Sequence, residues 1–278
     1  CWQLLKKSIT LSNLEPDSYY YVKTFARNDV GLSFGEELSF STTSHYRNML
    51  DFSASNGNIN VPVQLPDTGT MEFWAKTTFS YTDRTLWHAS GNESEGWFCE
   101  FSSNNLRAFI QGSALTYSNI IDNKWYHIAI TWNSYSQFGL GYAASQLYVN
   151  GNLIESYVSL SSFSPSANFK IGTQMYGSNA FNGQMDEFRL WDTIRTENYI
   201  WENMYESIDS SSDHLICHYS YDSFEGAIAV DFSLNGNDGT LHDFPIDPWL
   251  ISTAPIGEEG IGLRTTSPTS VGSSGKDM

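Results

Sequence analysis

Asp186 is the residue of this 278-residue sequence whose position has the clearest chemical consequence. It lies in the stretch FNGQMDEFRLWD, residues Phe181–Asp192, which alternates as a β-strand does. Because successive side chains of a strand point to opposite faces, Asp186 is predicted to face the core with Phe188, and Glu187 to face outward. A buried carboxylate needs a partner, since an unpaired charge in the interior costs several kcal/mol or more. That partner could be a metal ion, a set of backbone amides, or an arginine or lysine side chain.

Aromatic and amide side chains form a second group with a chemical use. Sugars are bound by stacking of their C–H faces on aromatic rings, while amides and carboxylates bond to their hydroxyl groups. Each ring could instead pack in the core, but two tyrosines lie in a long Gly-, Ser- and aromatic-rich loop, Ser134–Ser145, and are expected to be more exposed than the tryptophans. The predicted sugar-binding rings are Trp87, Trp97, Tyr135, Tyr142 and Tyr176, with Asn92, Asn104 and Gln111 as hydroxyl partners.

Catalytic motifs are not found in the sequence. A retaining glycosidase needs two carboxyl groups about 5–5.5 Å apart. The stretch MDEF places adjacent carboxylates on opposite faces of a strand, and ESEGWFCE interrupts its acids with a glycine turn. No Gly-x-Ser-x-Gly or His-Glu-x-x-His pattern occurs, and the six histidines form no convincing metal-binding motif. The sequence therefore predicts a protein that is not an enzyme.

The composition narrows the class of protein and of partner. Hydrophobic residues make up 40% of the chain, aromatic residues 15% and charged residues only 16%, which suits a β-sandwich with a surface rich in hydroxyls and amides. The formal net charge of −17 argues against nucleic acid and anionic membranes as partners. It is compatible with divalent cations, neutral glycans or basic proteins. Cys1, Cys99 and Cys217 are too few and too widely spaced for a disulfide framework or a zinc site, and Cys99 is predicted to pack in the core.

The pattern of short segments predicts an all-β fold. Strands of five to eight residues alternate with Gly, Asn, Asp and Ser, as in an antiparallel sandwich. Asn150-Gly151 indicates a two-residue hairpin, because both residues tolerate positive φ. One short helix is predicted at Thr196–Tyr205, with Thr196 as its N-cap. No run of about eighteen apolar residues could cross a membrane as a helix.

Four segments carry a resemblance to a known family. The closing strand FNGQMDEFRLWD, followed by a short helix, is similar to that of the laminin-G-like/pentraxin-like concanavalin A-type lectin domains, which are antiparallel jelly rolls. Residues from about 46 to 242 resemble such a domain, and the pair KWYHIAITWN and LYVNGNLI is its most specific part. The other matching segments are MLDFSASNGNINVP (Met49–Pro62) and TGTMEFWAK (Thr68–Lys76).

The resemblance implies a place for calcium. In this fold the first and last strands are neighbours, which would bring Asp186 near the loop that follows the opening strand. Calcium takes six to eight oxygen ligands from carboxylates, amides and backbone carbonyls. The candidate ligands are Asp51, Asn56, Asn58 and Asp186, although the loop has Ser and Asn where related domains carry further Asp residues. The alternative is that Asp186 only accepts hydrogen bonds from backbone N–H groups of that loop and so holds the loop in place.

The sequence suggests three parts. Residues 1–44 resemble the C-terminal part of a fibronectin type III domain, on the pattern Leu14-x-Pro16 and Tyr20-x-Val22. Residues 45–246 are predicted to form the jelly roll, and residues 247–278 a linker or disordered tail. Because the chain opens with CWQLLKKSIT, it is expected to be part of a longer polypeptide.

These observations lead to a functional expectation. The jelly roll is expected to be a non-catalytic carbohydrate-binding or adhesion module of a secreted or cell-surface multidomain protein, with a glycan or polysaccharide as ligand. The alternative is a structural or protein-interaction module that spaces or joins neighbouring domains.

Overall fold

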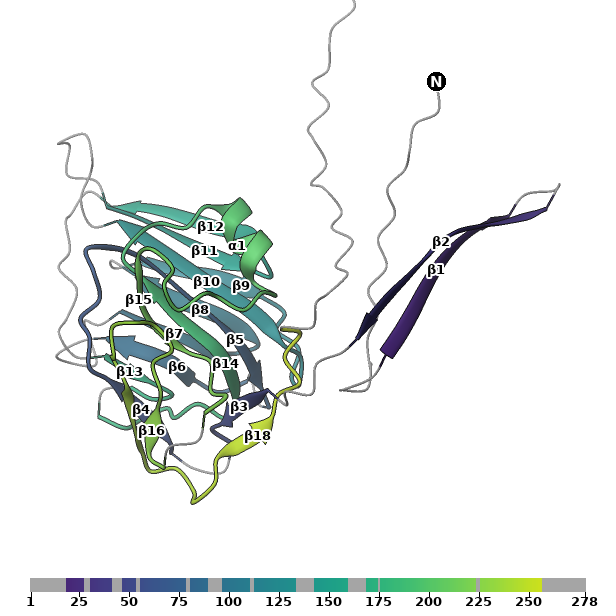
Figure 1. The fold of residues 1–278 in the computed structure, drawn as a ribbon. Helices are drawn as coiled ribbons and strands as arrows, with labels where there is room; N and C mark the ends of the chain where they lie inside the picture. Colours follow the sequence, from purple (N-terminus) through teal and green to yellow (C-terminus); the bar gives the residue numbers. More distant parts are fainter. Residues whose placement is uncertain are drawn as a thin grey trace, which may run out of the picture. The chain divides into compact units, whose positions relative to one another are not determined.

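The computed structural model describes two units. It describes residues 19–27, 31–41, 47–53, 56–78, 81–89, 97–110, 113–133, 143–159, 169–174, 176–223 and 226–256. Contacts divide the chain into a large unit, residues 46–256, and a second unit made of Cys1–His45 and Gly257–Met278. Figure 1 shows the large unit as a layered β structure. Among the described residues, no helix is long and apolar enough to cross a membrane.

The second unit contains one antiparallel hairpin. Strand β1 (Tyr19–Arg27) pairs with β2 (Leu32–Ser41), with Tyr20 opposite Phe40 and Val22 opposite Leu38. The hairpin lies where the end of a fibronectin type III domain is expected. Two strands are common to many folds, so that assignment stays a prediction.

Two eight-stranded antiparallel sheets make up the large unit, which confirms the all-β sandwich and its single short helix among the described residues. The first sheet has the order β12-β11-β10-β5-β14-β3-β18, with β15 also pairing with β14. Its strands are β3 (Asn48–Asp51), β5 (Thr68–Thr77), β10 (Tyr126–Asn133), β11 (Ala143–Val149), β12 (Asn152–Ser159), β14 (Gly183–Trp191), β15 (Leu215–Tyr219) and β18 (Trp249–Ile251). The second sheet has the order β16-β17-β4-β13-β6-β7-β8-β9. Its strands are β4 (Asn58–Val61), β6 (Arg84–Ala89), β7 (Trp97–Ser102), β8 (Asn105–Ile110), β9 (Ser113–Ser118), β13 (Phe169–Ile171), β16 (Ile228–Ala229) and β17 (Gly239–His242).

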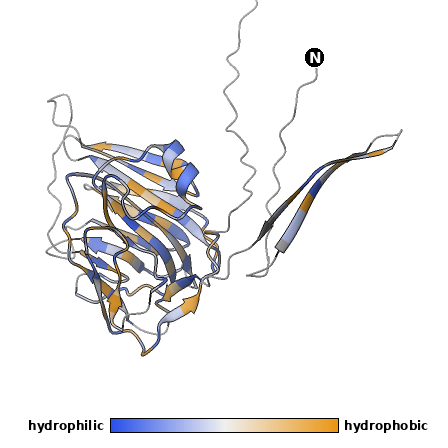
Figure 2. Cartoon of the chain, in the orientation of Figure 1, coloured by the Kyte–Doolittle hydropathy of each residue, from blue (hydrophilic) through white to orange (hydrophobic). Residues whose placement is uncertain are grey.

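The hydrophobic core contains apolar side chains from both sheets. Apolar and polar residues are mixed along the strands (Figure 2), as expected when one face of each sheet packs inward. Strand β8 shows this most clearly, since its residues alternate between half-buried and buried. Trp97 of the second sheet meets Trp132 of the first edge to face, with ring centroids 5.6 Å apart. Cys99 and Cys217 are both buried free thiols, as predicted for Cys99.

Helix α1 (Glu197–Asn203) contributes to covering the outer face of the first sheet. Thr196 caps it as predicted, because its Oγ1 accepts a hydrogen bond from Tyr199 N at 3.2 Å. The buried Ile200 packs against Ala129 and Tyr148 of the sheet below. Strand β14 is therefore buried almost throughout, unlike β8.

A β-bulge changes the predicted faces of β14. The register with β5 shifts between Asp186 and Arg189, and Glu187 has a φ of 49°. Met185 and Phe188 both lie in the core although they are three residues apart. The extra residue of a bulge permits this spacing. The prediction that Asp186 faces the core with Phe188 is therefore wrong, because regular alternation was assumed across the bulge.

The C-terminal segment completes both sheets. Strand β18 pairs with β3, and β17 pairs with β4. Trp249 joins the core and Ile256 packs with Trp74. The large unit thus includes residues 247–256, for which the sequence analysis had predicted a linker. That prediction relied on proline and glycine content and gave too little weight to these apolar side chains.

Candidate functional site

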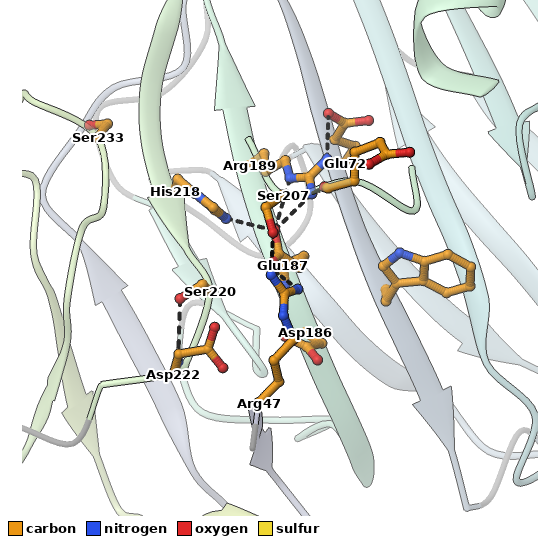
Figure 3. Close-up of polar contacts among 12 residues, drawn as sticks. Arg47, Glu72, Asp186, Glu187, Arg189, Ser207, His218, Ser220, Asp222 and Ser233 are labelled. Carbon is orange, nitrogen blue, oxygen red and sulfur yellow. Dashed lines mark hydrogen bonds and ion pairs between the residues drawn. The ribbon is translucent and has the colours of Figure 1, made fainter. Parts of the chain in front are cut away.

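A buried ionic network lies between α1 and the first sheet (Figure 3). Glu187 accepts hydrogen bonds from Arg189 Nε at 3.2 Å and Nη2 at 2.7 Å, both at Oε2. His218 Nε2 lies 2.7 Å from the same oxygen, and Arg47 Nη1 donates to Oε1 at 3.2 Å. The carboxylate of Glu187 is thereby satisfied on both oxygens.

Arg189 connects this network to the helix. Its Nη1 donates to the carbonyl oxygen of Asn203 at 3.1 Å, and its Nη2 to that of Glu206 at 2.7 Å. These carbonyls belong to the last turn of α1 and the segment after it, where backbone oxygens have no helical partner. Arg189 therefore fastens the helix end to the sheet.

Glu72 forms the other end of the network. Its Oε1 accepts from Trp191 Nε1 at 3.0 Å and lies 3.7 Å from Arg189 Nη1. Its Oε2 lies 3.5 Å from His127 Nε2. Both Glu72 and His127 are almost completely buried.

The pKa values follow from burial and pairing. Burial alone would raise the pKa of Glu187, but Arg189 and His218 outweigh it and hold the pKa well below its usual range. Burial raises the pKa of Glu72, with Arg189 opposing the shift. Burial and then the charge of Arg189 lower the pKa of His127 to about 3. A carboxylate beside a histidine could serve acid–base chemistry, but Glu72 and His127 are almost completely buried and out of reach of a substrate. The network is thus a structural device.

Asp186 lies on the same outer side of the first sheet. Its carboxylate accepts a hydrogen bond from Ser252 Oγ at 2.5 Å and one from Glu187 N at 2.8 Å. Burial, followed by the nearby charge of Glu187, raises its pKa well above the ordinary value. Neither donor belongs to the opening loop, because Glu187 N is the amide of the next residue and Ser252 lies in the C-terminal segment.

The predicted calcium ligands come from both sheets of the large unit. Asp51 lies in the first sheet and accepts from Ser53 N and Oγ, whereas Asn58 lies in the second sheet and donates to Asn56 O. The described residues contain no group of three His, Cys, Asp or Glu that could hold a metal ion. Calcium bound elsewhere stays a prediction.

The predicted sugar-binding residues separate into three groups. Trp87 and Trp97 are 0% and 1% exposed and belong to the core, so no sugar could stack on them. This corrects their assignment as ligand-binding rings, because large apolar rings on strands were drawn into the sandwich. Tyr176 is 71% exposed and Asn104 is also exposed. The others lie outside the described residues: Asn92, Gln111, Tyr135 and Tyr142.

Tyr176 and Asn104 belong to one end of the sandwich, which we call the rim. The rim consists of residues 81–84, 103–104, 119–123 and 176–179. Half of the ten described non-glycine residues with positive φ lie in it. Asparagine tolerates this backbone region better than most residues. The four exposed rim asparagines with positive φ are Asn104 (61°), Asn119 (66°), Asn123 (61°) and Asn179 (51°).

Backbone hydrogen bonds fix the rim loops to one another. Ser103 N donates to Tyr81 O at 3.1 Å, and Ile120 N to Asn104 O at 2.8 Å. Thr85 N, at the start of β6, donates to Asn179 O at 2.8 Å. The rim thus presents exposed amides and tyrosine rings on a connected backbone. The residues predicted from the sequence do not include Tyr81, Asn119, Asn123 or Asn179. Isolated asparagines in predicted turns could have indicated the three asparagines.

Comparison with known proteins identifies one matching family and several similar structures. The family model described as "Concanavalin A-like lectin/glucanases superfamily" matches residues 53–200. A structure of a candidate carbohydrate-binding protein from Bacteroides ovatus ATCC 8483 is similar at 20% identity, covering 88% of this chain and 72% of that one, with a TM-score of 0.60. This level of identity shows a common fold.

Two further structures are similar to this chain at lower identity and over a smaller part of it. A SAP-like pentraxin from Limulus polyphemus is 14% identical over 56% of this chain and 81% of its own, with a TM-score of 0.44. The CBM40 domain of a Ruminococcus gnavus IT-sialidase, bound to α2,3-sialyllactose, is 13% identical over 55% of this chain and 95% of its own, with a TM-score of 0.41. No curated protein sequence matches the chain.

Proposed function

The chain belongs to the concanavalin A-like lectin/glucanases superfamily, and on that premise we propose that its large unit is a non-catalytic carbohydrate-binding module. The observation that carries the proposal is the rim, where the 71% exposed ring of Tyr176 lies in a segment bonded, through Asn179, to β6. Exposed rings stack on sugars, and exposed amides exchange hydrogen bonds with sugar hydroxyls.

The positions of the described acids support a function without catalysis. Glu72, Asp186 and Glu187 are buried and accept hydrogen bonds from protein groups. Glu100, on the second sheet, is almost completely buried and paired with Arg107. A glycosidase needs two carboxyl groups that can reach the scissile bond, and none of these four is placed to do so. The glycan class is left open at this stage.

The wider setting belongs to the same proposal. We expect a secreted or cell-surface multidomain protein in which this module adheres to a glycan or polysaccharide. Support comes from the low fraction of charged residues and from the separate hairpin unit that precedes the large unit in the sequence.

A second candidate function is contact with a neighbouring protein module. The observation in its favour is a set of exposed apolar side chains near the C-terminal end of the large unit. Leu234 is 76% exposed, Ile251 is 60% exposed, and Ile246 is fully exposed. Single exposed apolar residues are normal, so this candidate ranks second.

A glycan array with the full chain tests the proposal. We expect binding that persists in EDTA, because the rim contains none of the predicted calcium ligands. Tyr176→Ala should weaken binding, whereas Tyr21→Ala, which removes a ring of similar exposure (66%) from the hairpin unit, should leave it unchanged. If the folded chain binds no glycan in calcium or in EDTA, contact with a neighbouring protein module becomes the favoured function.

A further inference from the structure

Tyr81 is a second exposed ring in the rim. It is 69% exposed, next to 71% for Tyr176, and these are the two highest values for aromatic side chains among the described residues of the large unit. Other exposed rings there, Tyr205 and Phe232, reach 43% and 39%. Large rings are usually packed against other groups, so two such exposed rings at one end of the sandwich call for an explanation.

The segments that carry the two rings are held to a common frame. Tyr81 O accepts from Ser103 N, at the turn between β7 and β8. The hairpin around Tyr176 is closed by Gln174 N donating to Ser178 O at 3.1 Å, and it joins β6 through the bridge between Thr85 and Ala180. A fixed frame reduces the entropy lost when a ligand binds.

The rim also limits the charge of a ligand. Its only Asp, Glu, Lys or Arg residues are Asp83, Arg84 and Asp122. Arg84 Nη1 donates to the carbonyl oxygen of Ala180 at 3.4 Å, within the frame itself. Recognition of a sugar carboxylate or sulfate relies on arginine or lysine. With two acids and one engaged arginine, in a chain of net charge −17, the rim disfavours acidic sugars.

We propose that the rim binds an uncharged oligosaccharide of at least two sugar residues, with Tyr81 and Tyr176 stacking on different residues of one glycan chain. The exposed amides of Asn104 and Asn179 bond to hydroxyl groups between the rings. This inference rests on the proposed carbohydrate-binding function and adds the ligand class and the second ring. It also predicts a dependence of affinity on glycan length, since two linked contacts bind more tightly than either alone.

The test is calorimetric titration of the full chain with neutral gluco-, xylo-, manno- and arabino-oligosaccharides of one to six residues. Oligogalacturonides and sialylated trisaccharides serve as acidic probes. We expect affinity for a neutral series to rise with length, and no comparable binding of the acidic probes. Tyr81→Ala and Tyr176→Ala should each weaken binding of the longer glycans by about three- to tenfold, which corresponds to one aromatic contact. Each should also flatten the length dependence.

Control variants separate binding from folding. Tyr81→Phe keeps the ring and should retain most of the affinity, and Tyr21→Ala should match the wild type. Both rings are exposed, so the melting temperature should not change in any of these variants. Binding of no glycan of any kind would overturn the proposed function itself. Glycan binding that is unchanged by Tyr81→Ala, or that selects acidic probes, would overturn this inference and leave the proposed function standing.

Discussion

The network under α1 and the rim are both rich in polar side chains, yet they use polarity in opposite ways. Under α1, Glu187 and Arg189 are buried and bonded mainly to each other and to backbone. In the rim, Tyr176 and Asn179 are exposed and the backbone supplies the order. Buried polar groups must be satisfied within the protein, whereas exposed ones can exchange water for a ligand. Titratable residues are therefore not by themselves evidence of a binding or catalytic site.

Arg189→Met should produce the largest loss of stability. The variant removes the cation between Glu187 and Glu72 and leaves two buried carboxyl groups without it. Breaking a buried pair in this way costs about 3–5 kcal/mol. Urea denaturation followed by circular dichroism measures the loss of free energy of unfolding. Asp192→Asn is the control, because the side chains of Asp192 and its partner His214 are 51% and 57% exposed and their pair should contribute only about 1 kcal/mol or less. Equal losses in the two variants would contradict a structural role for the network.

Replacement of His127 should have the next largest effect, which is on the pH dependence of stability. Its pKa is lowered to about 3 in the folded chain, against 6.5 for an ordinary histidine. The unfolded state therefore binds the proton first, and this residue makes stability fall as pH drops from about 6.5 to 3, by up to about 1.4 kcal/mol per pH unit. His127→Gln should make the stability curve flatter in that window. Unfolding at a series of pH values tests this. An unchanged slope in His127→Gln would show that the ring takes up its proton in the folded state.

The sequence anticipated the scaffold better than the site. Strand alternation, the asparagine–glycine turn and the Thr196 cap are local properties, and each is read from a few neighbouring residues. The bulge at Glu187 depends on how β14 pairs with β5, which alternation alone does not contain. Trp87 and Trp97 were predicted to bind sugar because a tryptophan ring can either stack on a sugar or pack in a core. Only the packing of the two sheets shows that both rings lie in the core. The segments of Tyr81 and Tyr176 both belong to the rim because the start of β6 and the end of β7 meet the segment after β13 there.

Asp186 should produce a smaller effect than His127. Burial and the nearby Glu187 raise its pKa, so the folded state holds the proton more tightly than the unfolded chain does. The contribution of this group to stability is therefore present at low pH and is lost as pH rises above the ordinary value of 3.8 for an aspartate. Asp186→Asn keeps an acceptor for Ser252 Oγ and cannot ionise, so stability at pH 7 should stay within about 1 kcal/mol of the wild type or increase. Thermal unfolding with and without calcium measures both the stability of the variant and its dependence on the metal. A calcium-dependent loss of melting temperature in the variant would restore the metal-site hypothesis.

Asn179→Gly should have the smallest effect on stability. It therefore gives the sharpest test of whether a rim side chain serves binding rather than folding. Its φ of 51° is a conformation that glycine adopts without strain. The variant should keep the free energy of unfolding within about 0.5 kcal/mol while removing the exposed amide. Asn179→Ala also removes the amide but places a Cβ in left-handed backbone, which costs about 1–2 kcal/mol. If the rim binds glycans, both variants should weaken binding to a similar degree although only the alanine variant loses stability. Titration and urea denaturation of the same preparations separate the two effects. A glycine variant that binds as the wild type does would assign Asn179 to backbone geometry alone, as Arg189 is assigned to structure under α1.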